Sequence, residues 1–213
     1  ARTTSSRGEL VLQRRGDGAL ELRVNGVFVM DTAHTKSEQA LARAVLEAGP
    51  APRRVLVGGL GLGFTVATLL ADPRVEQVLV AEIEPVVVAW LRDGTVPHGP
   101  ALLGDDRVDV RIGDVRDVLA DCGRESLDAV LLDVDNGPDH LVHAGNASLY
   151  REPFLTSCLD RLRPGGLLGI WSSTRSAPLE RALTSAAGGY TVRAHGVDLA
   201  GRAEEYALYL AMR

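Results

Sequence analysis

The stretch VLVGGLGLGFT, residues 55–65, constrains the fold of this chain more than any other part of the sequence. An apolar run leads into the pattern GxGxG, formed by Gly59, Gly61 and Gly63, and a helical pattern follows it. Glycines between a strand and a helix allow a tight turn and a close approach of the backbone to a ligand, while the helix N-terminus offers N–H groups to an anion. A tight turn that binds no ligand would have the same sequence pattern, so the neighbouring sequence must distinguish the two.

Strand and helix patterns alternate from this turn onward. The predicted strands are 53–59, 75–84, 107–112, 127–133, 167–173, 189–195 and 204–211, and the predicted helices are 62–71, 85–92, 115–121, 149–162 and 177–187. Such alternation is typical of a parallel sheet covered by helices on both faces, and we expect the last two strands to form an antiparallel edge. The sequence therefore predicts an α/β fold with a Rossmann-like, seven-stranded, mostly parallel sheet.

The first 35 residues have a different pattern. Short β-like runs at 9–14, 19–24 and 27–30 predict a small β meander, with a tight turn at Asn25-Gly26. A helical pattern follows, and its apolar stripe over 38–48 predicts a packing face, either against the core or against a second subunit of a homodimer. We expect a boundary at residue 35, between a meander (1–35) and a Rossmann-like domain (36–213).

Composition argues against several classes of function. The net charge of −5 argues against general nucleic-acid binding. No run approaches the roughly 18 apolar residues of a membrane span, and the N-terminus lacks an apolar signal core, so we expect a cytoplasmic protein without a membrane partner. Cys122 and Cys158 form no CxxC motif, and the G-x-S-x-G pattern of serine hydrolases is absent.

Acidic residues follow the ends of three predicted strands. Glu82 or Glu84 comes about 20 residues after the glycine turn, where a carboxylate can accept hydrogen bonds from ribose hydroxyls. Nicotinamide and S-adenosylmethionine folds share that feature. The GxGxG spacing and the pair Gly113-Asp114, which suits an adenine amino group, favour S-adenosylmethionine over a nicotinamide cofactor.

With these residues in place, the chain resembles the spermidine synthase-like branch of the class I S-adenosylmethionine-dependent methyltransferase superfamily. The resemblance runs from about residue 8 to residue 213. It covers LRVNGVFVMDT in the meander, the glycine loop, AEIEP, GDVRDVL, the LLD strand end and LYREPFLTSCLDRLRPGGLLGIW.

The resemblance implies a role for individual residues. It places Glu82 on the ribose, Asp114 on the adenine, and Asp133 at the catalytic aspartate that receives an acceptor amine and helps to remove its proton. Asp135 is a second catalytic candidate, with an Asx-type turn to Gly137 as the alternative. The cofactor-binding residues predicted in this way are Gly59, Gly61, Leu62, Gly63, Glu82, Ile83, Gly113, Asp114 and Asp133.

The acceptor side of the sequence departs from that family. Leu62 stands where spermidine synthases carry an aspartate that contacts the aminopropyl amine and disfavours the carboxylate of intact S-adenosylmethionine. Val29 replaces a glutamine, and Glu38-Gln39 replaces a tyrosine-histidine pair. The segment 133–138 is shortened. The cofactor half therefore matches the family, whereas the residues that recognise a polyamine are largely missing.

The polar segment 133–150 is open to other interpretations. The side chains of Asp133, Asp135, Asp139, His140 and His143 are competent metal ligands, but their spacing matches no known motif and we expect no metal. Whether His34, His140, His143 or Asn146 lines an acceptor pocket is left open, because a solvated loop would have the same composition.

The leading hypothesis is an enzyme that transfers a methyl or related alkyl group from S-adenosylmethionine to a small-molecule nucleophile such as an amine. An aminopropyltransferase that uses decarboxylated S-adenosylmethionine and an altered acceptor is the first alternative. The others are cyclisation of the cofactor's own amino acid chain and a non-catalytic nucleoside-binding protein.

Overall fold

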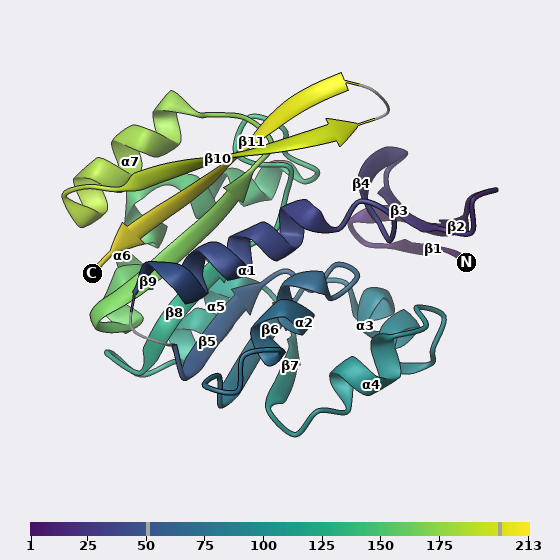
Figure 1. Ribbon diagram of the computed structural model, residues 1–213, viewed down its shortest axis with the longest axis horizontal. Helices are drawn as coiled ribbons and strands as arrows, with labels where there is room; N and C mark the ends of the chain where they lie inside the picture. The colour runs from purple at the N-terminus through teal and green to yellow at the C-terminus, as the bar shows by residue number, and fades with distance from the viewer. Residues whose placement is uncertain (50–51, 200–201) are drawn as a thin grey trace.

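Two β-sheets organise the structure (Figure 1). The computed structural model describes residues 1–49, 52–199 and 202–213, with the side chains of Glu38, 197–199 and 202–204 outside that description. The first sheet is antiparallel and contains, in spatial order, β1 (Arg2–Ser5), β2 (Gly8–Arg14), β3 (Leu20–Val24) and β4 (Val27–Asp31). It lies beside the start of the first helix.

The second sheet has the strand order β10-β11-β9-β8-β5-β6-β7 over the described residues. Its strands are β5 (Arg54–Gly58), β6 (Gln77–Glu82), β7 (Val108–Ile112), β8 (Leu127–Leu132), β9 (Leu162–Ser172), β10 (Thr191–Leu199) and β11 (Arg202–Met212). The strands from β9 to β7 pair in parallel, whereas β11 pairs antiparallel with both β9 and β10. The predicted seven-stranded, mostly parallel sheet and its antiparallel edge are confirmed.

Helices cover both faces of this sheet. They are α1 (Lys36–Ala48), α2 (Phe64–Leu70), α3 (Pro85–Arg92), α4 (Gly99–Leu103), α5 (Val115–Asp121), the 3₁₀ helix η1 (Ala144–Tyr150), α6 (Glu152–Arg161) and α7 (Ala177–Ala187). One core cluster joins α1, α2 and α3 to the sheet, and a second joins α5, α6 and α7 to its other face. None of the described helices is long and apolar enough to cross a membrane.

The apolar stripe of α1 packs within its own chain. Leu41 and Val45 are fully buried, and a Cβ atom on Gly169 of β9 would lie 2.8 Å from Val45 Cγ2. Gly169 therefore lets the helix approach the sheet closely. The stripe needs no second subunit to cover it, so the homodimer stays a prediction.

The prediction missed three local features. Strand β1 pairs with β2, but its sequence RTTS has no apolar alternation to reveal it. Helix α4 begins with Gly99-Pro100 and is absent from the predicted helices, although proline is well tolerated in the first helical turn. The predicted helix 149–162 is divided into η1 and α6, and β9 begins directly at Leu162.

The candidate site forms where β5, β6 and β8 end. Gly59 has a φ of +91°, and a Cβ atom there would lie 2.1 Å from the carbonyl oxygen of Asp133, just beyond β8. Only glycine fits such an approach without moving the backbone. The glycine loop and the end of β8 are thereby held against each other, at the carboxyl edge where open α/β sheets bind ligands.

Candidate functional site

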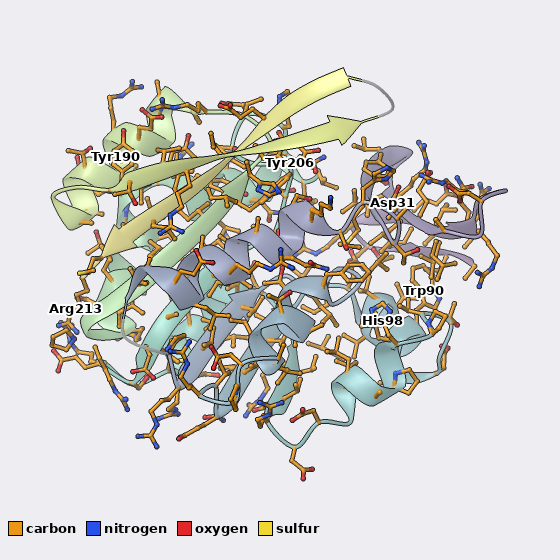
Figure 2. The ribbon with its side chains drawn as sticks, viewed as in Figure 1. Asp31, Trp90, His98, Tyr190, Tyr206 and Arg213 are labelled. Atoms are coloured by element: carbon orange, nitrogen blue, oxygen red, sulfur yellow. The ribbon has the colours of Figure 1, made fainter. Side chains whose placement is uncertain are left out.

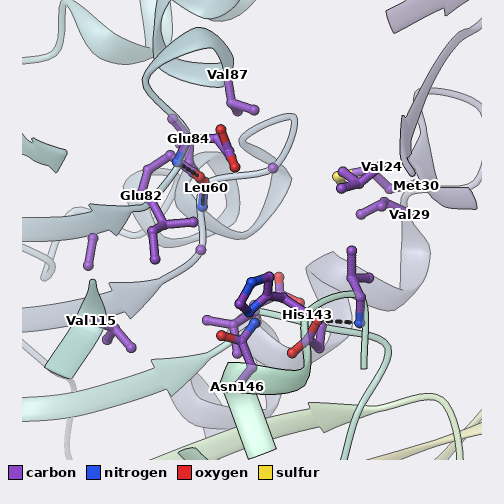
Figure 3. A pocket seen from close by; sticks show the side chains of 18 of the residues that line it. Val24, Val29, Met30, Leu60, Glu82, Glu84, Val87, Val115, His143 and Asn146 are labelled. Carbon is purple, nitrogen blue, oxygen red and sulfur yellow. Dashed lines mark hydrogen bonds between the residues drawn. The ribbon is translucent and has the colours of Figure 1, made fainter. Parts of the chain in front are cut away.

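A pocket with an empty volume of about 1230 Å³, counted to its open mouth, lies between the carboxyl edge of the large sheet and the N-terminal sheet. Figure 3 shows Leu60 and Glu82 on one side and Val24, Val29 and Met30 on the other, with His143 and Asn146 between them. Its lining contains every predicted site residue except Leu62 and Gly63. We call the side with Glu82 the cofactor half. The acceptor half comprises the N-terminal sheet wall and the segment 133–150.

The glycine loop presents only part of itself to the pocket. Gly59 and Gly61 line it, whereas the side chain of Leu62 is 1% exposed and belongs to the core. The Leu62 carbonyl oxygen lies 2.7 Å from His98 Nε2, and its N–H lies 3.1 Å from Met30 Sδ. A Cβ atom on Gly63 would lie 2.3 Å from Leu102, so Gly63 serves packing. The Leu62 side chain thus packs in the core and places no charge in the pocket.

Glu82 is held by the backbone around it. Its side chain is buried, with Oε2 accepting a 2.9 Å hydrogen bond from the Leu60 N–H and Oε1 a 2.8 Å bond from the Glu84 N–H. Burial raises the pKa of Glu82, and these backbone bonds oppose the shift. Ile83 also lines the pocket, and the Glu84 Oε1 atom accepts a 3.1 Å bond from Ser5 Oγ. The Glu82 carboxylate fixes the loop whether or not a ligand is bound.

Asp114 lines the pocket between the end of β7 and the start of α5. Its Oδ1 atom caps helix α5 by accepting a 2.9 Å bond from the Arg116 N–H. The Arg116 guanidinium also donates to both carboxylate oxygens, which lowers the pKa of Asp114. Sequence reasoning missed this pairing, although a carboxylate and an arginine two residues apart at a helix start could have suggested it. Asp114 is therefore a charged carboxylate, and its bonds to Arg116 fix its orientation before it accepts any further hydrogen bond.

Asp133 is the acidic side chain best placed for chemistry. It follows β8, lines the pocket and is only partly exposed. Its Oδ2 atom accepts a 2.7 Å hydrogen bond from Thr65 Oγ1, whereas Oδ1 accepts no hydrogen bond from the described residues. Burial raises the pKa of Asp133 to about 6, opposed by the bond from Thr65. A carboxylate with that pKa and one open oxygen can exchange a proton near neutral pH.

Asp135 ties the segment after β8 into a fixed loop. Its Oδ1 atom accepts a 2.8 Å bond from the Val142 N–H, seven residues ahead, and Oδ2 is buried without a hydrogen bond of good geometry in the described structure. Burial raises the pKa of Asp135, while the Asn146 side chain and the Val142 and His143 N–H groups oppose that shift. The structure therefore shows a long-range loop anchor in place of the Asx-type turn to Gly137.

The structure separates the undecided polar residues. His143 and Asn146 line the pocket, and His143 Nδ1 accepts a bond from the Gly145 N–H. His34 lies outside and pairs with Asp31 through Nδ1 at 3.1 Å, and His140 is exposed on the loop. Among the described residues no three acidic, histidine or cysteine side chains are grouped to hold a metal ion.

The N-terminal sheet supplies pocket residues that sequence reasoning did not assign. They include Arg7 in the β1–β2 turn and an apolar set on β2, β3 and β4, namely Leu10, Leu22, Val24, Val29 and Met30. Trp171 on β9 also lines the pocket. The alternation in LVLQR and LELRV could have identified the inward-facing side of the sheet, but not what that side faces.

A parallel sheet with this strand order, a glycine loop after β5 and carboxylates after β6, β7 and β8 define a nucleoside-cofactor fold of the class I S-adenosylmethionine-dependent type. The "Spermine/spermidine synthase domain" family matches residues 34–184, and the chain belongs to this family.

Curated relatives carry two kinds of name. Putrescine N-methyltransferase 2 of Nicotiana tabacum is 30% identical over 154 residues, which are 71% of this chain and 39% of that protein. Polyamine aminopropyltransferase 2 of Hyperthermus butylicus is 32% identical over 128 residues, 60% of this chain and 41% of that protein. The chain spans about two fifths of the length of these relatives.

Solved structures match the whole chain. A spermidine synthase in complex with the transition-state analogue AdoDATO aligns with a TM-score of 0.84 at 16% identity, covering 100% of this chain and 72% of that one. The spermidine synthase of Thermotoga maritima aligns with a TM-score of 0.82 at 15% identity, with the same coverage. At these identities the likeness shows the fold, including the N-terminal antiparallel sheet.

Proposed function

We propose that the protein is an S-adenosylmethionine-dependent transferase that moves a methyl or related alkyl group to the amine of a small molecule. The single observation that carries this proposal is Asp133, a partly open carboxylate with a raised pKa beside the glycine loop. The amine-modifying relatives support an amine as the acceptor.

The residues present suit such a cofactor. Gly59 and Gly61 leave backbone exposed to the pocket where any Cβ atom would clash, and Glu82, Ile83, Gly113 and Asp114 line the same half. In this proposal Glu82 holds the ribose and Asp114 the adenine amino group. When bound, the cofactor supplies an electrophilic carbon on a positively charged sulfur. Asp133 orients the acceptor amine and accepts its proton at Oδ1.

Methyl transfer is preferred because the described glycine loop puts no carboxylate into the pocket. Leu62 is uncharged and buried in the core, so the carboxylate of intact S-adenosylmethionine meets no repelling negative charge from this loop. Aminopropyl transfer from decarboxylated S-adenosylmethionine is the second candidate, and the aminopropyltransferase relatives favour it.

Calorimetric titration with S-adenosylmethionine, its decarboxylated form and methylthioadenosine tests the proposal. We expect the intact cofactor to bind at least as tightly as the decarboxylated form. Selective binding of the decarboxylated form would favour aminopropyl transfer, and binding of none of the three would remove the proposal. Binding without transfer to any amine would favour a non-catalytic nucleoside-binding protein.

Three further predictions stay open: the boundary at residue 35, the homodimer and the cytoplasmic location. Limited proteolysis, sedimentation and cell fractionation test them in turn.

A further inference from the structure

The acceptor half of the pocket has an apolar wall. Leu22 and Val24 on β3 and Val29 and Met30 on β4 face the pocket, and Trp171 adds an aromatic surface. Figure 3 shows Val24, Val29 and Met30 together on the side opposite Glu82. Among the described lining residues, these strands place no carboxylate on that wall. The charged lining residue of the N-terminal sheet is Arg7, a cation.

Most carboxylates of the lining already have partners. Both oxygens of Glu82 accept backbone hydrogen bonds, Glu84 accepts one from Ser5, and Asp114 is paired with Arg116. The Oδ1 atom of Asp135 is bonded to the Val142 N–H, and its Oδ2 atom is buried and accepts no hydrogen bond from the described residues.

Asp133 differs in exposure from the other lining carboxylates that have an unbonded oxygen. Glu84 Oε2 and Asp135 Oδ2 also accept no hydrogen bond from the described residues, but both of those side chains are only 7% exposed. The Oδ1 atom of Asp133 is without a partner among the described residues, and the side chain remains partly exposed. Asp133 Oδ1 is thus the unbonded carboxylate oxygen on the most exposed of these three side chains, and the pocket that it lines has an apolar wall. A second ammonium group directed at that wall would lose its hydration without finding an opposite charge, which is unfavourable.

We propose that the acceptor is a primary monoamine with an apolar body, and not a diamine or polyamine. The proposal rests on the proposed function, because it names the substrate class of the same site. The amine group lies at Asp133, and the hydrocarbon body lies against Val24, Val29, Met30 and Trp171. In the transfer, the amine nitrogen forms a bond to the methyl carbon while the carbon–sulfur bond breaks. The bonding pair stays on sulfur, and the nitrogen gives one proton to Asp133 Oδ1.

Two ligands of equal size test this proposal directly. n-Pentylamine and 1,4-diaminobutane have the same number of non-hydrogen atoms and differ by a methyl group in place of an ammonium group. We expect the complex with S-adenosylhomocysteine to bind n-pentylamine at least tenfold more tightly in calorimetry. Equal or tighter binding of the diamine, or no binding of either amine, would overturn the proposal.

The binding measurement separates this inference from the proposed function. If n-pentylamine binds preferentially but neither amine receives a methyl group, the acceptor proposal stands and the transferase proposal fails. If both are methylated and the diamine binds better, the transferase proposal stands and the acceptor proposal fails. Across n-propylamine to n-hexylamine, affinity should rise about threefold per methylene group until the wall is filled.

A negative charge added to the apolar wall should change the preference for n-pentylamine over 1,4-diaminobutane. Val29→Glu places a carboxylate where the apolar body would lie, so we expect diamine affinity to rise at least tenfold and n-pentylamine affinity to fall. Val27→Glu is a matched control, because Val27 is also on β4 but is 48% exposed and outside the lining. If Val29→Glu unfolds, Val29→Gln should shift the preference in the same direction by a smaller factor. An unchanged preference in folded Val29 variants would contradict the proposal.

Discussion

In the cofactor half of the pocket, Glu82 and Asp114 are each held by more than one hydrogen bond. Glu82 is bonded to the N–H groups of Leu60 and Glu84, and Asp114 to the backbone and guanidinium of Arg116. In the acceptor half, Asp133 receives a single bond from Thr65. The cofactor half is therefore set before any ligand binds.

The contrast separates binding from chemistry. Arg116 lowers the pKa of Asp114, which keeps that group charged, whereas burial raises the pKa of Asp133 to about 6, where it can gain or lose a proton. Substitution of Asp133 in the acceptor half should alter turnover, whereas substitutions in the cofactor half should alter the affinity for the cofactor.

The largest expected effect is that of Asp133→Asn on turnover. An amide cannot accept the amine proton, so we expect methyl transfer to fall at least a hundredfold while calorimetric cofactor affinity changes less than threefold. Asp139→Asn is the control, since Asp139 is exposed on the same segment and outside the lining. Wild-type turnover in Asp133→Asn would remove Asp133 from the chemistry.

The pH dependence should follow the same group. Because the pKa of Asp133 is about 6, kcat/KM should fall about tenfold per pH unit below that value. The pH profile of kcat/KM for Asp133→Asn should lack this change of slope near pH 6 but keep any pH dependence that arises from protonation of the amine substrate. A wild-type profile without a break between pH 5 and pH 7 would contradict the assignment.

The raised pKa also predicts how stability depends on pH. The folded state binds more protons than the unfolded chain between the ordinary value of 3.8 and about 6, so stability falls as pH rises through that window. Asp133→Asn should therefore be more stable than wild type above pH 6, by at most about 3 kcal/mol and less where solvent reaches the site. Thermal unfolding at pH 4 and pH 7.5 measures the difference, which should shrink at the lower pH.

Glu82→Gln should weaken cofactor binding, because Glu82 lies in the cofactor half of the pocket. An amide can replace one accepting oxygen but directs N–H groups at the second backbone donor, so one of the two bonds is lost. We expect cofactor affinity to fall about tenfold, with kcat at saturating cofactor reduced less than threefold. Glu76→Gln, on the exposed pair with Arg53, is the control. A loss confined to kcat would contradict the division between the halves.

The two halves also differ in how well the sequence predicts them. Local signals predict residues of the cofactor half that all line the pocket: Gly59 and Gly61 follow an apolar strand, Glu82 ends the next strand, and Asp114 follows the one after it. Each of these residues takes its place from its own strand end, which a period-two apolar run locates well.

The acceptor half depends on contacts between distant segments, which periodicity does not record. The sequence predicts Asp135 as a second catalytic candidate, with a local turn to Gly137 as the alternative, and neither interpretation predicts its bond to the Val142 N–H seven residues ahead. The sequence predicts Leu62 at the cofactor site, which stays a prediction, but it does not predict that the side chain is buried in the core. Which strands would face the pocket from the N-terminal sheet could not be read before the two sheets were placed together.

The smallest expected effect concerns the glycine loop itself. His98, labelled in Figure 2, is at the start of α4. Its Nε2 atom lies 2.7 Å from the Leu62 carbonyl oxygen, and its ring centroid lies 5.0 Å from that of Phe64, with the two rings tilted by 37°. His98→Ala removes that support without touching the acceptor half, so we expect cofactor affinity to fall about threefold and kcat to stay unchanged. His98→Gln, which can still donate to the carbonyl, should restore part of the affinity, whereas exposed His140→Ala should have no effect. A change in the pH break near 6 in His98→Ala would show that the loop and Asp133 are coupled, and the two halves would then not be separable.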